Sequence, residues 1–156
     1  MGGVFRQEEH HLKILVINGP NLNMLGIREP HIYGSGTYND LIELIKREAE
    51  ARRVRVAFVQ SNHEGALVDA IQDAYGVADG IIINPGAYTH TSVALLDAVK
   101  AVGIPTVEVH ISDPDTREEF RKISYIRPAC IATVKGKGFA GYVEAMDILM
   151  KQGKSA

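Results

Sequence analysis

The sequence is poor in cysteine, in long apolar runs and in excess charge of either sign. It has one cysteine, Cys130, among 156 residues, so an intrachain disulfide cannot form and a cysteine metal site is not expected. The 17 basic and 19 acidic side chains leave a formal net charge of −2, which offers no basic field for the phosphates of nucleic acids. The apolar runs are far shorter than the ~18 residues that would cross a bilayer. We therefore expect a cytoplasmic protein that binds neither nucleic acid nor membrane.

The rest of the composition is that of a folded domain. Hydrophobic residues make up 46% and charged residues 23% of the chain, close to the globular averages of ~45–50% and ~25%. A length of 156 residues fits one domain. We expect a single domain over residues 12–152, an N-terminal extension or tag remnant over residues 1–11, and a C-terminal tail over residues 153–156.

Short apolar runs alternate with amphipathic stretches along the chain. The runs predict buried strands at residues 12–17, 54–59, 80–84, 106–109 and 130–134. Between them the apolar residues take helical spacing, as at Leu41 and Ile45 or at Leu67 and Ile71. This βαβα alternation predicts an α/β fold, a flavodoxin-like three-layer sandwich with a five-stranded parallel sheet.

Polar residues follow directly after the first four predicted strands. They form the segments Asn-Gly-Pro-Asn at 18–21, Gln-Ser-Asn-His-Glu at 60–64, Asn-Pro-Gly-Ala-Tyr-Thr-His at 84–90 and His-Ile-Ser-Asp at 110–113. Ligands of open α/β sheets bind outside the carboxyl ends of the strands. The sequence therefore predicts a binding site where these four segments meet.

A glycine motif near the C-terminus could suggest a dinucleotide site. Gly136, Gly138 and Gly141 spell G-x-G-x-x-G between a predicted strand and a helix. The motif follows the last strand rather than the first, and the chain ends before the acidic ribose ligand expected ~20 residues further on. We interpret the glycines as close packing of a helix on the sheet, and we expect no cofactor.

Histidines at strand ends raise the alternative of a metal site. The histidines are His63, His90 and His110. No two of them have the sequence spacing typical of metal ligands, and no cluster of carboxylates accompanies them. We therefore expect no metal. Glu108 and His110 stand two residues apart in a strand, so their side chains share one face and the carboxylate can orient the imidazole.

The connection between the first strand and the first helix is long and rich in glycine. It spans residues 26–37 and carries Arg28 and Tyr33. Long loops of this kind are often functional, so one interpretation is a lid that closes over the strand ends. In the alternative, Arg28 is a solvated charge and Tyr33 packs on the surface.

Five segments of the sequence, in this order and spacing, resemble type II 3-dehydroquinate dehydratases. They are INGPNLNMLGIREPHIYG, QSNHEG, NPGAYTHTSVALLDA, VEVHIS and REEFRKISY, and the resemblance spans about residues 13–149. It implies a flavodoxin-like catalytic domain that converts 3-dehydroquinate to 3-dehydroshikimate by enolate-type anti elimination, in the shikimate pathway or in quinate breakdown. It also implies no cofactor and a homododecamer built from trimers.

The resemblance assigns roles in catalysis to four residues, and the strand spacing adds a fifth, Glu108. Tyr33 is the base, acting as its phenolate, and Arg28 supplies the cation that makes ionisation possible. Asn21 holds a water against the enolate oxygen. His110 is the acid that protonates the departing hydroxyl, and Glu108 is its orienting partner.

The resemblance also assigns substrate contacts. The carboxylate is taken by the backbone N–H groups of Ile111 and Ser112, where we expect a helix capped by Thr116 to begin. The carboxylate and the ring hydroxyls are also held by the side chains of Asn84, His90 and Arg121. Asp97 reaches the site of a neighbouring subunit. Asp113 and Asp115 depart from the family pattern by adding negative charge here. A flavodoxin-like nucleotide or flavin binding module and an inactive assembly protein are the competing hypotheses.

Overall fold

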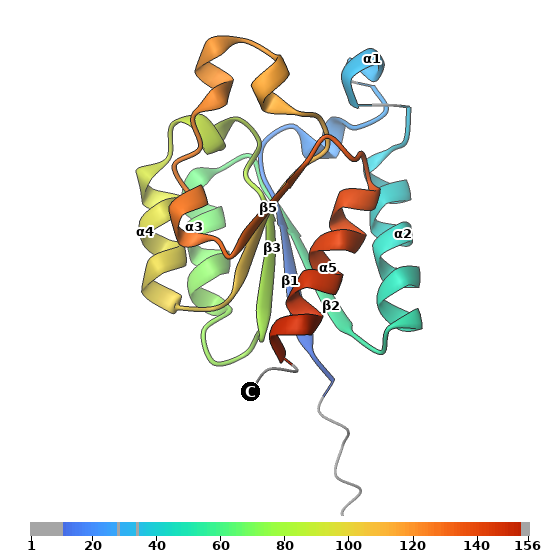
Figure 1. Ribbon diagram of the computed structural model, residues 1–156, viewed down its shortest axis with the longest axis vertical. Coiled ribbons are helices and arrows are strands. Elements are labelled where there is room, and N and C mark those ends of the chain that lie inside the picture. Colours follow the sequence, from blue (N-terminus) through green and yellow to red (C-terminus); the bar gives the residue numbers. More distant parts are fainter. Residues whose placement is uncertain (1–10, 28, 34, 154–156) are drawn as a thin grey trace, which may run out of the picture.

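The centre of the molecule is a parallel sheet (Figure 1). The computed structural model describes residues 11–27, 29–33 and 35–153. Its five strands lie in the order β2-β1-β3-β4-β5, all parallel. They are β1 (Lys13–Asn18), β2 (Arg55–Gln60), β3 (Gly80–Asn84), β4 (Thr106–His110) and β5 (Ala132–Lys135). The predicted flavodoxin-like sheet is confirmed, with strand ends shifted by one or two residues.

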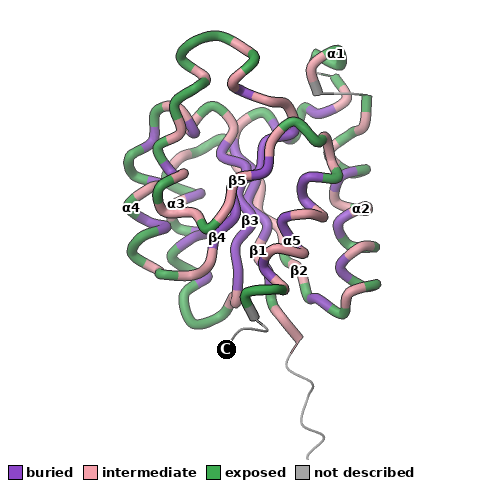
Figure 2. The backbone as a smooth tube through the Cα atoms, viewed as in Figure 1, coloured by how far each residue is buried: buried purple, intermediate pink, exposed green. Residues whose placement is uncertain are grey.

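Two helices cover each face of the sheet. The helices α2 (Tyr38–Ala51) and α5 (Ala140–Gly153) lie on one face, and α3 (Glu64–Asp73) and α4 (Val93–Val102) lie on the other (Figure 1). The strands between them are mostly buried, whereas the outer helix faces are exposed (Figure 2). Burial on both faces is why the strands are continuous apolar runs rather than alternating ones.

Local signals in the sequence set two of the helix ends. At the start of α2 the Thr37 hydroxyl accepts from the Asp40 backbone N–H, and the Asp40 carboxylate accepts from the Thr37 N–H. These bonds satisfy donors that the first turn of a helix leaves unpaired. At the end of α4, Gly103 has φ of 64°, a left-handed conformation that costs glycine little.

The loops after β1 and β3 are packed directly against each other. A Cβ atom added to Gly19 would lie 2.3 Å from the carbonyl oxygen of Pro85. Gly86 has φ of +60°, and a Cβ there would lie 2.9 Å from the carbonyl oxygen of Pro20. Glycine is therefore needed at both positions, and the close approach fixes the two loops at the point where the strand order reverses.

Three short helices connect β4 to β5: the first two lie above the carboxyl edge of the sheet, and the third packs against α4 (Figure 1). They are η3 (Pro114–Thr116), η4 (Glu119–Lys122) and η5 (Arg127–Ala129). The expected helix capped by Thr116 is wrong. The Asp113 side chain accepts from the Asp115 N–H and caps η3, while the Thr116 hydroxyl donates to the Asp113 carbonyl. An aspartate before a proline favours this tight turn over a longer helix.

Within the described part of the chain, no helix combines the length and apolar character needed to cross a membrane.

Candidate active site

Strand β4 places an acidic side chain and an imidazole in contact below the carboxyl edge. The Nε2 atom of His110 lies 2.5 Å from Oε2 of Glu108. Both residues are buried, with 0% exposure for Glu108 and 7% for His110. The spacing of two residues predicted a shared face, and the contact confirms it. Because the carboxylate accepts from Nε2–H, the Nδ1 atom of His110 is left for a ligand.

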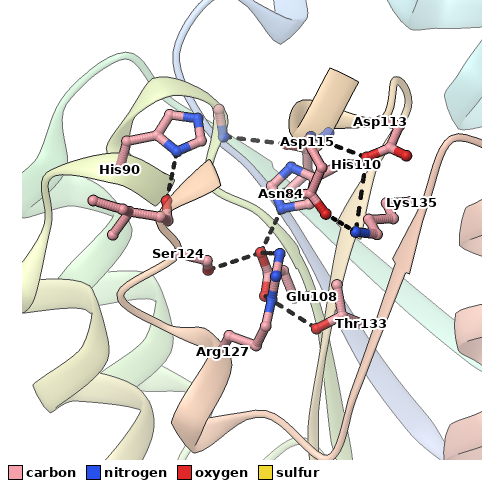
Figure 3. Close-up of polar contacts among 12 residues, drawn as sticks. Asn84, His90, Glu108, His110, Asp113, Asp115, Ser124, Arg127, Thr133 and Lys135 are labelled. Atoms are coloured by element: carbon pink, nitrogen blue, oxygen red, sulfur yellow. Dashed lines mark hydrogen bonds and ion pairs between the residues drawn. The ribbon is translucent and has the colours of Figure 1, made fainter. Parts of the chain in front are cut away.

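The carboxylate of Glu108 has partners from four other residues (Figure 3). Its oxygens accept from His110, from the hydroxyls of Ser124 at 2.8 Å and Thr133 at 3.2 Å, and from the guanidinium of Arg127. Burial alone would raise the pKa of Glu108, but the hydrogen bonds from His110 and Arg127 outweigh it and lower the pKa to about 2. Glu108 is therefore an anion at neutral pH.

His90 is held with a defined hydrogen-bonding role. Its Nδ1 atom lies 2.7 Å from the carbonyl oxygen of Ile123 (Figure 3), and a carbonyl only accepts, so Nδ1 carries the proton. Burial lowers the pKa of His90, and the positive Arg121 and the nearby His110 lower it further. The ring is thus neutral at pH 7, which leaves Nε2 as an acceptor for a donor such as a ligand hydroxyl.

A pocket opens above His110 at the carboxyl edge. Of the residues that the sequence assigned to the site, seven line it: Asn21, Asn84, His90, His110, Ile111, Ser112 and Arg121. Glu108 lies behind His110, in contact with it. Three of the four strand-end segments predicted to meet at one site, 18–21, 84–90 and 110–113, therefore contribute residues to this pocket.

Asn21, in the loop after β1, and Asn84, at the end of β3, both line the pocket. Asn21 has φ of 70°, and its backbone N–H donates to Oδ1 of Asn62 at 3.1 Å. Asparagine tolerates this left-handed conformation better than most residues. Asn84 accepts from the Gly86 N–H through Oδ1, and it donates through Nδ2 to the Tyr142 hydroxyl, both at 3.1 Å. The second Nδ2 hydrogen of Asn84 is left for a ligand.

The glycine motif supports the segment that follows β4. Gly138 N–H donates to the Ile111 carbonyl at 3.0 Å, and Gly136 N–H donates to the Ser112 carbonyl at 3.2 Å. In a trans peptide the N–H points opposite to the carbonyl, so Ser112 N–H points away from Gly138. A Cβ on Gly141 would lie 3.3 Å from Val134, which agrees with the predicted packing of helix on sheet.

Basic side chains from η4 and the segment before it close one side of the pocket. Arg121 lines the pocket, and its Nε donates to Glu118 at 2.6 Å. Arg117, which the sequence analysis did not select, also lines the pocket. Its Nη2 lies 4.0 Å from a carboxylate oxygen of Glu29. This ion pair joins the rim of the pocket to the segment that leads into α1 (Pro30–Tyr33).

Three of the predicted site residues are not placed in the pocket. Arg28 and the side chain of Tyr33 lie outside the described residues, although the Tyr33 backbone ends α1. Asp97 is exposed on α4 and does not line the pocket of its own chain. Its predicted role in a neighbouring subunit stays a prediction.

Lys135 explains how two additional acidic residues are accommodated beside the site. It forms ion pairs with Asp113, at 3.7 Å, and with Asp115 (Figure 3). The hydrogen bond from Lys135 lowers the pKa of Asp115. The lysine therefore offsets negative charge close to Ser112. The described residues contain no group of three or more histidine, cysteine or acidic side chains arranged to hold a metal.

Three residues that were not predicted from the sequence support the site from behind: Thr133, Tyr142 and Arg127. Thr133 is paired with Glu108 in the register of β4 and β5, so strand alternation would place it on the same face once that register was known. Tyr142 lies on α5, and the partners of its hydroxyl have no signal in the sequence. Arg127 follows no motif, and its contact depends on the course of the loop between η4 and β5.

These features define the class of protein. A pocket lined by amides, histidines and arginines, above a buried carboxylate–histidine pair at the carboxyl edge of a parallel sheet, is typical of an enzyme that binds a small polar ligand. The sequence profile of the family Dehydroquinase class II matches residues 12–150. The chain belongs to this family. The nucleotide or flavin binding module is not favoured.

Curated relatives match most of the chain. The 3-dehydroquinate dehydratase of Clostridium acetobutylicum is 56% identical over 138 residues, which are 88% of this chain and 96% of that protein. The 3-dehydroquinate dehydratase 1 of Corynebacterium efficiens is 57% identical over 137 residues, 88% of this chain and 91% of that one.

Solved structures agree with this assignment. The type II dehydroquinase of Butyrivibrio crossotus has a TM-score of 0.89 and 52% identity, covering 90% of this chain and 98% of that one. The type II dehydroquinase of Propionibacterium acnes has a TM-score of 0.86 and 36% identity, covering 90% of this chain and 99% of that one.

Proposed function

We propose that this protein dehydrates 3-dehydroquinate to 3-dehydroshikimate. The observation that carries the proposal is the buried Glu108–His110 contact beneath a pocket lined by the predicted substrate residues, in a chain of the class II dehydroquinase family. In this anti elimination the proton leaves carbon 2 and the hydroxyl leaves carbon 1 as water. A carbon–carbon double bond forms, conjugated to the ketone.

The first step is removal of the proton by Tyr33 as its phenolate. An unperturbed tyrosine titrates near pH ~10, so ionising it at pH 7 costs about 4 kcal/mol at ~1.36 kcal/mol per unit. Arg28, five residues earlier, supplies the positive charge that offsets this cost. Closure of the segment carrying both residues excludes water and brings base and cation to the substrate together.

Asn21 and His110 act on the enolate and on the leaving hydroxyl. A water held by Asn21 hydrogen-bonds the enolate oxygen. His110 donates a proton from Nδ1 to the departing hydroxyl, while the Glu108 carboxylate on Nε2 stabilises the imidazolium. No lysine lines the described part of this pocket, which supports an enolate route rather than an imine route.

The substrate is gripped by polar groups that the fold has already oriented. Ile111 and Ser112 offer backbone N–H groups to the carboxylate. The remaining Nδ2 hydrogen of Asn84, the Nε2 acceptor of His90 and the guanidinium of Arg121 suit ring hydroxyls.

The wider setting follows from the same proposal. The catalytic domain comprises residues 12–152 and acts without a cofactor in the cytoplasm, in the shikimate pathway or in quinate breakdown. It assembles as a homododecamer built from trimers, in which Asp97 on exposed α4 reaches the site of a neighbouring subunit.

The direct test is to mix the purified protein with 3-dehydroquinate and follow the ultraviolet absorbance of the conjugated enone. The account predicts a rise in absorbance with turnover and identification of 3-dehydroshikimate by NMR. Folded protein that produces no enone would contradict it.

A further inference from the structure

Arg127 makes a two-point contact with the buried carboxylate of Glu108. Its Nε lies 3.2 Å from Oε1, and its Nη2 lies 3.3 Å from Oε2. The side chain of Arg127 is 35% exposed, whereas that of Glu108 is 0% exposed. The guanidinium from η5 is therefore the more exposed member of the pair, and it lies against the buried carboxylate (Figure 3).

Each other partner of Glu108 reaches a single oxygen. His110 and the Ser124 hydroxyl contact Oε2, and the Thr133 hydroxyl contacts Oε1. Each one-point contact by itself leaves the plane of a carboxylate able to turn, whereas a planar guanidinium bound to both oxygens restrains it. Arg127 thus adds an in-plane restraint to the orientation of Oε2 toward Nε2 of His110.

We propose that Arg127 is a positioning residue that holds the Glu108 carboxylate in line with His110 for the acid–base step. The proposal rests on the proposed function, because it assigns His110 the role of acid. Arg127 does not line the pocket, and it acts through Glu108. It lies outside the five sequence segments that resemble type II 3-dehydroquinate dehydratases.

The surrounding charges give Arg127 a second effect. The other ionisable groups near Glu108 and His110 come from several elements. They are His90 on η2 (Gly86–His90), Asp115 on η3, Arg121 on η4, Cys130 after η5 and Lys135 on β5. Burial raises the pKa of Cys130 to about 12, so its thiol stays neutral. Among the described residues, Arg127 is the arginine or lysine in contact with Glu108.

Loss of Arg127 should therefore let Glu108 take up a proton at higher pH. Burial favours the neutral acid, and the variant keeps only His110 and two hydroxyls against it. A protonated Glu108 no longer stabilises the imidazolium of His110. The expected sign is a loss of activity on the acid side of the pH profile.

The test compares Arg127→Met with Arg127→Lys and with Arg52→Met. Arg52 also bridges two carboxylates, of Glu48 and Asp147, but between α2 and α5, away from the pocket. For Arg127→Met we expect kcat at pH 7 to fall about tenfold, part of the ~10²-fold or more that general acid catalysis contributes, with KM within about twofold. The ratio of kcat/KM at about pH 5 to kcat/KM at pH 7 should also be lower in Arg127→Met than in the wild type. Arg52→Met should keep both the wild-type kcat and the wild-type ratio.

The conservative variant separates charge from geometry. Arg127→Lys should restore the pH ratio because it keeps the positive charge, but kcat should stay reduced because one ammonium group cannot bind both oxygens in plane. A wild-type kcat for Arg127→Lys would overturn the two-point argument, including in the case that Arg127→Met does not fold.

Two further measurements distinguish this proposal from the proposed function. In a Glu108→Gln background, adding Arg127→Met should leave kcat unchanged; an equal fall in both backgrounds would overturn the proposal. Infrared difference spectra report the protonated carboxyl band of Glu108, assigned by its absence in Glu108→Gln. That band should appear at higher pH in Arg127→Met than in the wild type, whether or not the protein dehydrates 3-dehydroquinate, and an unchanged onset would contradict the coupling.

Discussion

The side-chain amide of Asn84 donates to the hydroxyl of Tyr142 over 3.1 Å, across the boundary between β3 and α5. The same hydroxyl donates to Asn18 at 2.6 Å. Burial raises the pKa of Tyr142, so the phenol keeps its proton and can serve both partners. A helix residue 58 positions away in sequence thus orients an asparagine of the pocket.

Tyr142→Phe should therefore weaken both the fold and the grip on substrate. Removing the hydroxyl leaves buried amide groups of Asn18 and Asn84 without their partner, at a cost of about 1–3 kcal/mol. Chemical unfolding should show this loss, and KM should rise more than kcat falls. Tyr75→Phe is the matched control, because Tyr75 is 71% exposed; equal effects in the two variants would count against an oriented Asn84.

Tyr33→Phe should abolish turnover and preserve ligand binding, because only the phenolic oxygen is lost. Steady-state kinetics gives the first result, and calorimetry with a competitive inhibitor gives the second. Near-normal turnover by this variant would show that another group is the base.

Replacing His110 by alanine should separate the two halves of the elimination. Departure of the hydroxyl should be severely slowed, by ~10²-fold or more, while exchange of the carbon 2 proton with solvent deuterium should be partly retained. NMR of the substrate in deuterated buffer measures this exchange. Loss of exchange together with turnover would argue against His110 as the acid.

Glu108 should make folding stability depend on pH. Its pKa is about 2 in the folded protein, against an ordinary value of 4.5. A group with a lowered pKa contributes stability that is present above pH 4.5 and is lost as pH falls toward 2. At ~1.36 kcal/mol per unit, the contribution is about 3 kcal/mol.

The corresponding measurement is the unfolding free energy of the wild type and of Glu108→Gln between about pH 7 and pH 3. The wild type should lose more stability than the variant over this range. Parallel curves for the two proteins would mean that Glu108 does not hold its charge as the contacts indicate.

Much of this architecture could be predicted from the sequence because it depends on local patterns. Apolar runs such as Gly80–Asn84 predict buried strands directly. The spacing of Glu108 and His110 places their side chains on one face of a strand. The arrangement of short helices between β4 and β5 could not be predicted in the same way. In this segment the Asp113 side chain caps η3, and the position of Arg127 depends on the path by which the loop returns to the sheet.

The pocket shows the same division. Asn21, Asn84 and His90 could be located from strand ends and motifs. The hydroxyl of Tyr142 and the Glu29–Arg117 ion pair could not, because each joins segments far apart in sequence through contacts that only the packed structure defines.

Enone formation from 3-dehydroquinate after borohydride treatment tests most directly whether elimination proceeds through an enolate without a covalent intermediate. Protein and substrate are first incubated with borohydride, which would trap an imine on lysine, and the remaining activity is then measured. Activity equal to that of untreated protein is the predicted result. Inactivation that depends on substrate, with a stable adduct seen by mass spectrometry, would contradict the account.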